Sequence, residues 1–262
     1  MYTPFDFNEA IGHRKEYIEE RLREGSPVVG LAYDGGMMLL TVRRTQRKIY
    51  EIYDRQMFSA IGNQSDIEQV RLAAIQRAHK EGFDRSPDDV TLHRLVGFEL
   101  SPAIKRAFGD QLTSPFVIKS LFAEIGAPGR EDVFLVLNFD GEFRQLAGAA
   151  AIAGTQVAED RMMERIGEPS PARSRDAAMR LALSAWIVGA REALRPRGGH
   201  KDEDDLDMLL SSDSAVDESA FLRDELKTAS VEVGVLERPG GRESRFRLLA
   251  PAELDPMLAD HA

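Results

Sequence analysis

The residues whose side chains most often carry chemistry are few and scattered in this sequence. The chain has no cysteine, which excludes disulfides, thiolate catalysis and cysteine-ligated metal centres. Its five histidines are His13, His79, His93, His200 and His261, and their spacing matches no standard zinc motif. We therefore predict no metal site and no cofactor.

Glycine pairs and one acidic run are the remaining local candidates for a binding function. The pairs at 35–36, 198–199 and 240–241 read as turns, and none lies in a phosphate-binding loop. The run Asp202–Asp207 has the charge to bind cations weakly, but a solvated loop is the simpler interpretation. Residue type and spacing alone thus identify no catalytic motif.

Composition limits the class of protein. The 262 residues are 43% hydrophobic and 30% charged, which suits a soluble globular protein with a sizeable core. A net charge of -10 argues against a general nucleic-acid binder. There is no signal peptide and no apolar run of transmembrane length, so we expect a cytoplasmic protein without nucleic-acid or membrane partners.

The N-terminal part predicts a helix followed by a hairpin. Residues 5–24 are predicted to form a polar helix that Asn8 can cap. Its apolar stripe is narrow, which indicates a helix that lies on the protein surface or against a neighbouring chain. Val28–Tyr33 and Met37–Val42 are apolar runs joined by Asp34-Gly35-Gly36, a strong hairpin signal. Both faces of these strands should be covered.

A basic loop, Arg43–Lys48, leads to two more strands and two helices. The strands are expected at Ile49–Asp54 and Met57–Ile61. A capping box of Ser65 and Glu68 opens a helix that ends at Gly82. A second helix begins near Ser86-Pro87 and ends near Phe108, antiparallel to the first because the connection is short.

The second half repeats strands, helices and strands. Strands are predicted at Phe116–Ile125, Val133–Phe139, Phe143–Ile152, Ser230–Leu236 and Phe246–Leu249, and helices at 155–166, 174–195 and 251–259. Residues 196–226 read as an acidic, mobile insertion. The order lacks βαβ alternation, so two antiparallel sheets with helix pairs outside them explain it best.

Four stretches in this order resemble the proteasome family of N-terminal-nucleophile hydrolases. They are GSPVVGLAYDGGMMLLTVRRT, RKIYEIYDRQMFSAIGNQSDIEQV, AIAGTQVAEDRM and VEVGVLERPGGRESRFRLL. The resemblance covers residues 8–250 except the acidic insertion, and it implies an α+β fold, a four-layer αββα sandwich. A helix before the first strand resembles α-type subunits, especially bacterial ones, whereas catalytic β-type subunits expose an N-terminal threonine.

The resemblance also implies a division of the chain. Residues 1–24 would be an N-terminal gate segment and helix, residues 25–250 the αββα domain with the insertion 196–226, and residues 251–262 a C-terminal helix or tail.

The family chemistry needs a hydroxyl nucleophile, its own free α-amino group, a lysine and an acid. The resemblance places Ser26 at the nucleophile and Lys48 at the lysine. Val42 stands where the acid should be, Pro27 fixes the next backbone unit, and a free amine would require removal of residues 1–25. The resemblance therefore implies an inactive subunit in which Ser26 is a degenerate nucleophile position.

In α-type subunits the matching lysine receives the C-terminal carboxylate of an activator. The resemblance thus makes Lys48 and Gly62 activator-docking candidates, and the alternative is a solvated lysine among Arg43, Arg44 and Arg47. The implied partners are copies of the same chain in a ring, seven by analogy, a β-type subunit, a ring ATPase activator and protein substrates in transit.

Two other functions stay open on the sequence. The chain could be a self-processing hydrolase that uses Ser26, or a proteasome-like homo-oligomer without a protease partner.

Overall fold

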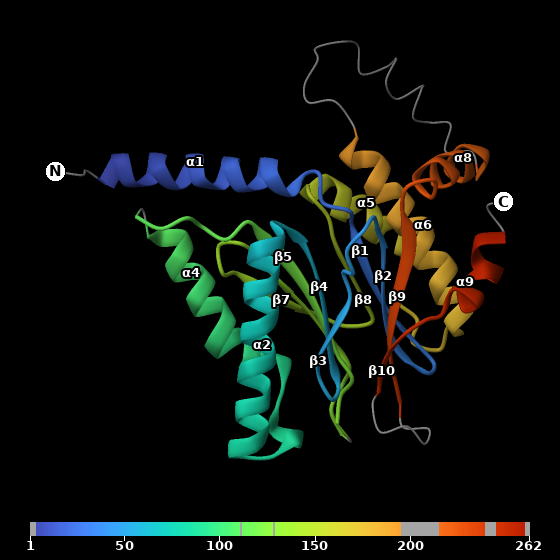
Figure 1. Cartoon of the computed structure of the whole chain (residues 1–262), viewed down its shortest axis with the longest axis horizontal. Helices are drawn as coiled ribbons and strands as arrows, with labels where there is room; N and C mark the ends of the chain where they lie inside the picture. Colours follow the sequence, from blue (N-terminus) through green and yellow to red (C-terminus); the bar gives the residue numbers. More distant parts are fainter. Residues whose placement is uncertain (1–3, 111, 128, 195–214, 239–244, 260–262) are drawn as a thin grey trace, which may run out of the picture.

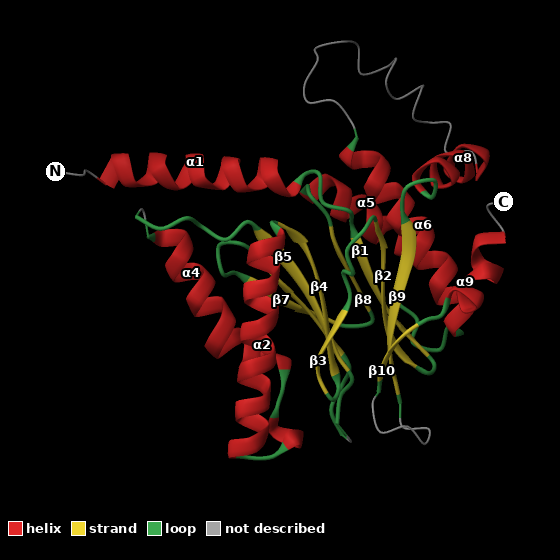
Figure 2. Cartoon of the chain, in the orientation of Figure 1, coloured by secondary structure: helices red, strands yellow, loops and turns green. Residues whose placement is uncertain are grey.

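Ten strands in two antiparallel sheets form the centre of the protein in the computed structural model, which describes residues 4–110, 112–127, 129–194, 215–238 and 245–259 (Figures 1 and 2). The first sheet has the order β10-β9-β2-β1-β8 and the second the order β3-β4-β5-β6-β7. The strands are β1 Val28–Tyr33, β2 Gly36–Arg43, β3 Tyr50–Tyr53, β4 Gln56–Gly62, β5 Ile118–Glu124, β6 Val133–Leu137, β7 Phe143–Leu146, β8 Ala149–Ile152, β9 Ser230–Glu237 and β10 Phe246–Leu248.

Apolar side chains alternate between the two faces of each sheet, as the pleat of a strand requires. In β2, Met37 and Leu39 pack between the two sheets, while Met38 and Leu40 pack under helices. The second sheet likewise has an inner cluster and a helix-covered cluster, to which Phe58 and Phe122 belong. Strands β1 and β2 are therefore buried on both faces, as their doubly apolar runs predicted.

Helices lie outside the sheets on both sides (Figure 2). The second sheet is covered by α2 Gln64–Asp84, the short turns Pro87–Asp89 and α3 Leu92–Arg94, the π-helical segment Leu95–Leu100 and α4 Ser101–Gly109. The first sheet is covered by α5 Gln156–Ile166, α6 Arg175–Ala193, α8 Ala215–Glu225 and α9 Pro251–Leu258. The order helix, sheet, sheet, helix agrees with the sequence prediction of two antiparallel sheets flanked by helices. Among the described residues, no helix combines the length and apolar character that crossing a membrane demands.

Helix α1, Pro4–Leu22, extends across one end of the layered body (Figure 1). Ile18 and Leu22 are buried in the cluster between the sheets. The Arg14 guanidinium donates hydrogen bonds to the carbonyl oxygens of Ala107, at 3.3 Å, and Thr113, at 2.6 Å. These contacts fix α1 against the end of α4, so α1 is part of the folded body.

Three predicted helix boundaries are wrong. Helix α1 begins at Pro4, a residue that favours the first helical turn, so Asn8 lies inside the helix and is not its cap. Asn63, not Ser65, caps α2, because the Asn63 side chain accepts a hydrogen bond from the Ser65 amide at 2.9 Å. Gly82 does not end α2; it is buried, and a Cβ there would lie 2.2 Å from the Tyr53 hydroxyl oxygen.

The second predicted helix begins later than expected. Ser86 caps only a 3₁₀ turn at Pro87–Asp89, and the helical stretch starts at Leu92 with Thr91 as its cap. It ends at Gly109, close to the expected end.

The predicted strand Phe143–Ile152 is two strands in different sheets. Gly148 has φ of 73°, a conformation that β-strands exclude, and the chain passes there from β7 to β8.

The predicted insertion at 196–226 is shorter than expected. Residues 195–214 lie outside the described residues, but residues 215–225 form α8. Glu218 is only 5% exposed and accepts two hydrogen bonds from the Arg165 guanidinium, at 2.9 and 3.0 Å. Leu222 is fully buried in the helix-covered cluster of the first sheet. The division of the chain at residues 24 and 250 stays a prediction.

Replacing Gly36 and Gly12 by alanine should change stability in opposite directions. Gly36 has φ of 152°, and a Cβ would lie 2.0 Å from the Leu236 carbonyl oxygen. We expect Gly36→Ala to lower the free energy of unfolding by about 2–4 kcal/mol. Gly12 lies inside α1 with open space around it, so Gly12→Ala should raise it by about 0.5–1 kcal/mol. Urea unfolding measures the free energy of unfolding of both variants. Equal effects would contradict the close approach of Gly36 to Leu236 that the pairing of β2 with β9 creates.

Candidate functional site

A groove of about 860 Å³ lies at the end of the body where α1 meets the sheets. Its walls come from the end of α1, the loop between β2 and β3, the start of α2, the end of α6, and α8. Ser26, Lys48 and Gly62 all line this groove. The fold thus brings together the three candidate residues from separate stretches of the sequence.

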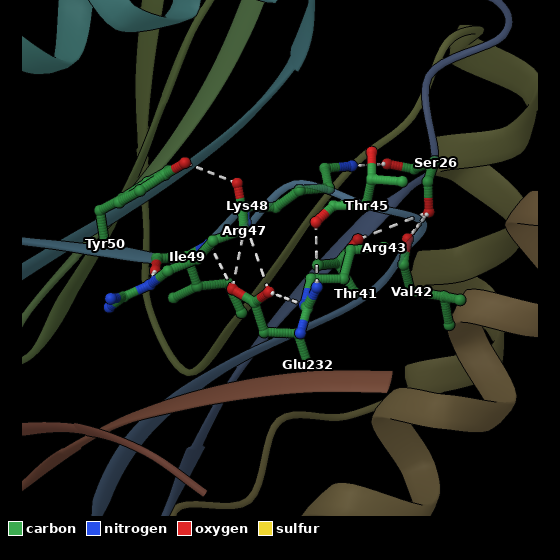
Figure 3. Close-up of polar contacts among 10 residues, drawn as sticks. All are labelled: Ser26, Thr41, Val42, Arg43, Thr45, Arg47, Lys48, Ile49, Tyr50 and Glu232. Atoms are coloured by element: carbon green, nitrogen blue, oxygen red, sulfur yellow. Dashed lines mark hydrogen bonds and ion pairs between the residues drawn. The ribbon is translucent and has the colours of Figure 1, made fainter. Parts of the chain in front are cut away.

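The ammonium group of Lys48 points to the backbone of Ser26 (Figure 3). Its Nζ donates a hydrogen bond of 2.7 Å to the Ser26 carbonyl oxygen. Burial lowers the pKa of Lys48 to about 8, and the nearby Glu232 carboxylate acts in the opposite direction. Lys48 is therefore a partly buried cation at neutral pH, rather than the solvated surface lysine of the alternative interpretation.

Glu232 bonds to the backbone of the basic loop and to the Arg43 side chain. This β9 residue is 5% exposed, and its carboxylate accepts hydrogen bonds from the amides of Ile49, at 2.7 Å, and Lys48, at 3.1 Å. The Arg43 Nε also lies 2.7 Å from a Glu232 oxygen (Figure 3). Sequence reasoning missed Glu232; the only signal was a carboxylate inside an otherwise apolar strand, where burial demands partners.

Arg47 ties the same loop to the edge strands of both sheets. Its Nε donates to the Ile49 carbonyl oxygen at 2.6 Å, and the Tyr50 hydroxyl donates to the Arg47 carbonyl oxygen at 2.6 Å. Its guanidinium lies 5.3 Å from the centre of the Tyr50 ring in β3 and 5.5 Å from that of Phe246 in β10, within cation–π range. The loop that carries Lys48 is thus fixed at several points.

The hydroxyl of Ser26 is fully used in hydrogen bonds. It donates to the Val42 carbonyl oxygen at 2.7 Å and accepts from the Trp186 indole nitrogen at 3.2 Å. The Ser26 nitrogen is in the peptide bond with Gly25, so no free amine stands beside the hydroxyl in the intact chain. The buried Val42 side chain offers no carboxylate. At Ser26 and Val42 the intact chain therefore offers neither the free amine nor the carboxylate that the family resemblance places at these two positions.

Gly62 forms the edge of the groove where β4 turns into α2. Its φ is 129°, and a Cβ would lie 2.0 Å from the Val117 carbonyl oxygen. The turn therefore requires glycine, and it also positions Asn63 as the cap of α2. In the described part of the chain, no group of three or more metal-ligand side chains could hold an ion, in the groove or elsewhere.

Curated bacterial proteins similar to this chain include several named proteasome subunit alpha. The one from Frankia casuarinae is 26% identical over 99% of this chain and 98% of its own length. Those from Frankia alni and Thermomonospora curvata are 27% and 28% identical over 100% of this chain, and over 99% and 98% of their own lengths. No protein-family model matches the chain. The similarity therefore extends from α1 to α9 and is not confined to the groove.

The titration of Lys48 tests the geometry of the groove. We expect the ¹³Cε signal of Lys48, assigned by its absence in Lys48→Arg, to titrate with a midpoint near pH 8. Glu232→Gln should lower this midpoint, because it removes a nearby negative charge that favours the ammonium form. Glu237→Gln, at the other end of β9, is the matched control and should leave it unchanged. An ordinary lysine midpoint near 10.4 would contradict the burial of this ammonium group.

Proposed function

We propose, from the similarity of this chain to bacterial proteins named proteasome subunit alpha, that it is a non-catalytic subunit of a cytoplasmic proteasome-like particle. Copies of the chain form a ring, of seven by analogy, that controls the entry of protein substrates into a proteolytic chamber built by a β-type chain. The layered body is then the four-layer αββα sandwich of the N-terminal-nucleophile hydrolases, here without the nucleophile.

The environment of Ser26 is the observation that carries this proposal. Its hydroxyl donates to one backbone carbonyl and accepts from the Trp186 indole, and its nitrogen follows Gly25 in the chain. The packing of Ile18 and Leu22 into the inter-sheet cluster argues against α1 as a disposable leader. Residues 1–25 serve in this proposal as a retained helix and gate segment, because a gate acts by steric exclusion and needs no catalytic group.

Lys48 is the proposed receptor for the C-terminal carboxylate of a ring ATPase activator, with Gly62 at the edge of the same groove. An ammonium group has three protons, and the Ser26 carbonyl accepts one of them. The other two can bind a carboxylate without displacing the contact seen in Figure 3. The groove around Lys48 supplies the space that a peptide tail needs.

Helix α2 and the helical stretch after it are the proposed contact with the β-type ring. Phe83 is 92% exposed and Phe98 is 69% exposed, and exposed large apolar residues often mark interfaces. Phe83 lies in the last turn of α2, about 28 Å along the helix from the groove at its first turn. The two proposed partners would therefore contact opposite ends of the subunit.

Reconstitution with the β-type chain of the same genome tests the non-catalytic role. We expect electron microscopy to show stacked rings, and peptide hydrolysis only in the mixture. Ser26→Ala should leave the rate within about twofold, because the hydroxyl takes no part in chemistry. Replacing the N-terminal threonine of the β-type chain is the matched control and should abolish hydrolysis. Loss of activity in Ser26→Ala would favour the hydrolase alternative, and absence of any β-type chain from native complexes would favour a homo-oligomer without a protease partner.

The pH dependence of tail binding tests the role of Lys48. We expect a peptide with a free C-terminal carboxylate to bind with constant affinity between pH 6 and about 7.5. Above a pH of about 8 Lys48 loses its proton, so binding should weaken. Calorimetric titration measures the affinity. Lys48→Arg keeps its charge over this range and should remove the pH dependence, while Lys48→Ala should bind weakly at every pH. Equal binding of the C-terminally amidated peptide would contradict a carboxylate receptor.

A further inference from the structure

The basic side of the groove holds three cations that lack carboxylate partners. Arg44 is exposed and makes no hydrogen bond or ion pair within the described ranges. Arg47 and Lys48 bond to backbone oxygens and, for Arg47, to aromatic rings, but neither forms an ion pair there. Only Arg43 is neutralised, by Glu232. The chain as a whole has a net charge of -10, so this local excess of positive charge is a candidate site for an anionic ligand.

The opposite side of the groove is apolar and firmly held. Its accessible residues are Phe221 of α8 and Leu194 beyond α6, which is 70% exposed. Trp186 of α6 is buried beneath them, with its ring centre 6.3 Å from that of Phe221. The Arg165–Glu218 ion pair fixes α8 in place against α5 and α6. The groove therefore presents a basic surface and an apolar surface to the same occupant.

We propose that the groove selects a C-terminal peptide tail with an acidic side chain close to its terminal carboxylate and an apolar side chain farther from its end. The terminal carboxylate binds Lys48, the acidic side chain lies against Arg44 and Arg47, and the apolar side chain packs on Phe221 and Leu194. This inference rests on the carboxylate docking proposed above and adds the chemistry of the tail.

Charge complementarity favours a short acidic tail over other anions. A neutral tail would leave Arg44 and Arg47 without a carboxylate partner. A polyanion such as a nucleic acid would also meet Glu24 and Glu225, which line the same groove. A tail with one side-chain carboxylate and one terminal carboxylate avoids both problems, because it can place its charges on the basic side alone.

The fluorescence of Trp186 provides a readout, because it is the only tryptophan of the chain and its buried ring lies next to that of Phe221 in the groove. The full-length protein is titrated with three synthetic eight-residue peptides. The first ends in Leu-Ala-Asp-Ala with a free carboxylate, the second has asparagine in place of aspartate, and the third is the first with an amidated C-terminus. Calorimetry on the same samples covers the case in which the indole does not respond.

We expect the asparagine peptide to bind about threefold to tenfold more weakly than the aspartate peptide, and the amidated peptide not to bind measurably. Arg44→Ala should remove the preference for aspartate and leave the affinity for the asparagine peptide unchanged. Arg106→Ala, an exposed arginine on α4, is the matched control and should keep the preference. Leu194→Ser changes an exposed side chain, so folding should be unaffected, and it should weaken both free-carboxylate peptides.

The outcomes separate this inference from the docking function. Equal affinity for the aspartate and asparagine peptides, with the free carboxylate still required, would overturn the acidic selectivity and leave the carboxylate receptor standing. Binding of none of the peptides would overturn the receptor itself. Binding that appears only after deletion of residues 200–210 would identify the chain's own acidic residues as the occupant, and it would overturn the proposed partner tail.

Discussion

The groove depends on the buried carboxylate of Glu232. This group lies between the amides of Lys48 and Ile49 and the Arg43 guanidinium. A carboxylate removed from water is stable only with such partners, so the loop and the strand fix each other. These contacts fix the backbone conformation of the basic loop. In this conformation the Lys48 ammonium group donates to the Ser26 carbonyl oxygen, and the Arg47 guanidinium lies within cation–π range of the Tyr50 and Phe246 rings.

The contacts of Ser26 bear on whether this groove binds a ligand or catalyses a reaction. A hydroxyl, a lysine and a glycine turn lie around one groove, as a nucleophilic mechanism would need. The hydroxyl of Ser26, however, is held between Val42 and Trp186, and in the intact chain its nitrogen is in the peptide bond with Gly25. What remains available is positive charge beside an apolar wall. That combination suits the recognition of a peptide carboxylate better than attack on a peptide bond, and docking is therefore the function that we propose for the groove.

Sequence reasoning predicted the parts of the fold that depend on local patterns. The hairpin of β1 and β2 followed from its turn and its doubly apolar runs, and α5 and α6 agree with the helices expected at 155–166 and 174–195. The errors arose where tertiary packing overrides a local signal. Gly82 reads as a helix end, but it lies inside α2, where the Tyr53 hydroxyl leaves no space for a Cβ. Gly148 divides a predicted strand because the chain passes there between sheets.

Family resemblance pointed to the residues of the groove, but not to what holds them. Lys48 and Glu232 are 184 positions apart in the chain, so no local pattern could pair them. The apolar wall was hidden for a similar reason, since α8 lies within a stretch whose composition suggested a solvated insertion. The intact mass of the purified protein, alone and after assembly with a β-type chain, tests the non-catalytic assignment most directly. We predict the mass of the full 262-residue chain in both samples; a mass that lacks residues 1–25, with Ser26 as the new N-terminus, would contradict it.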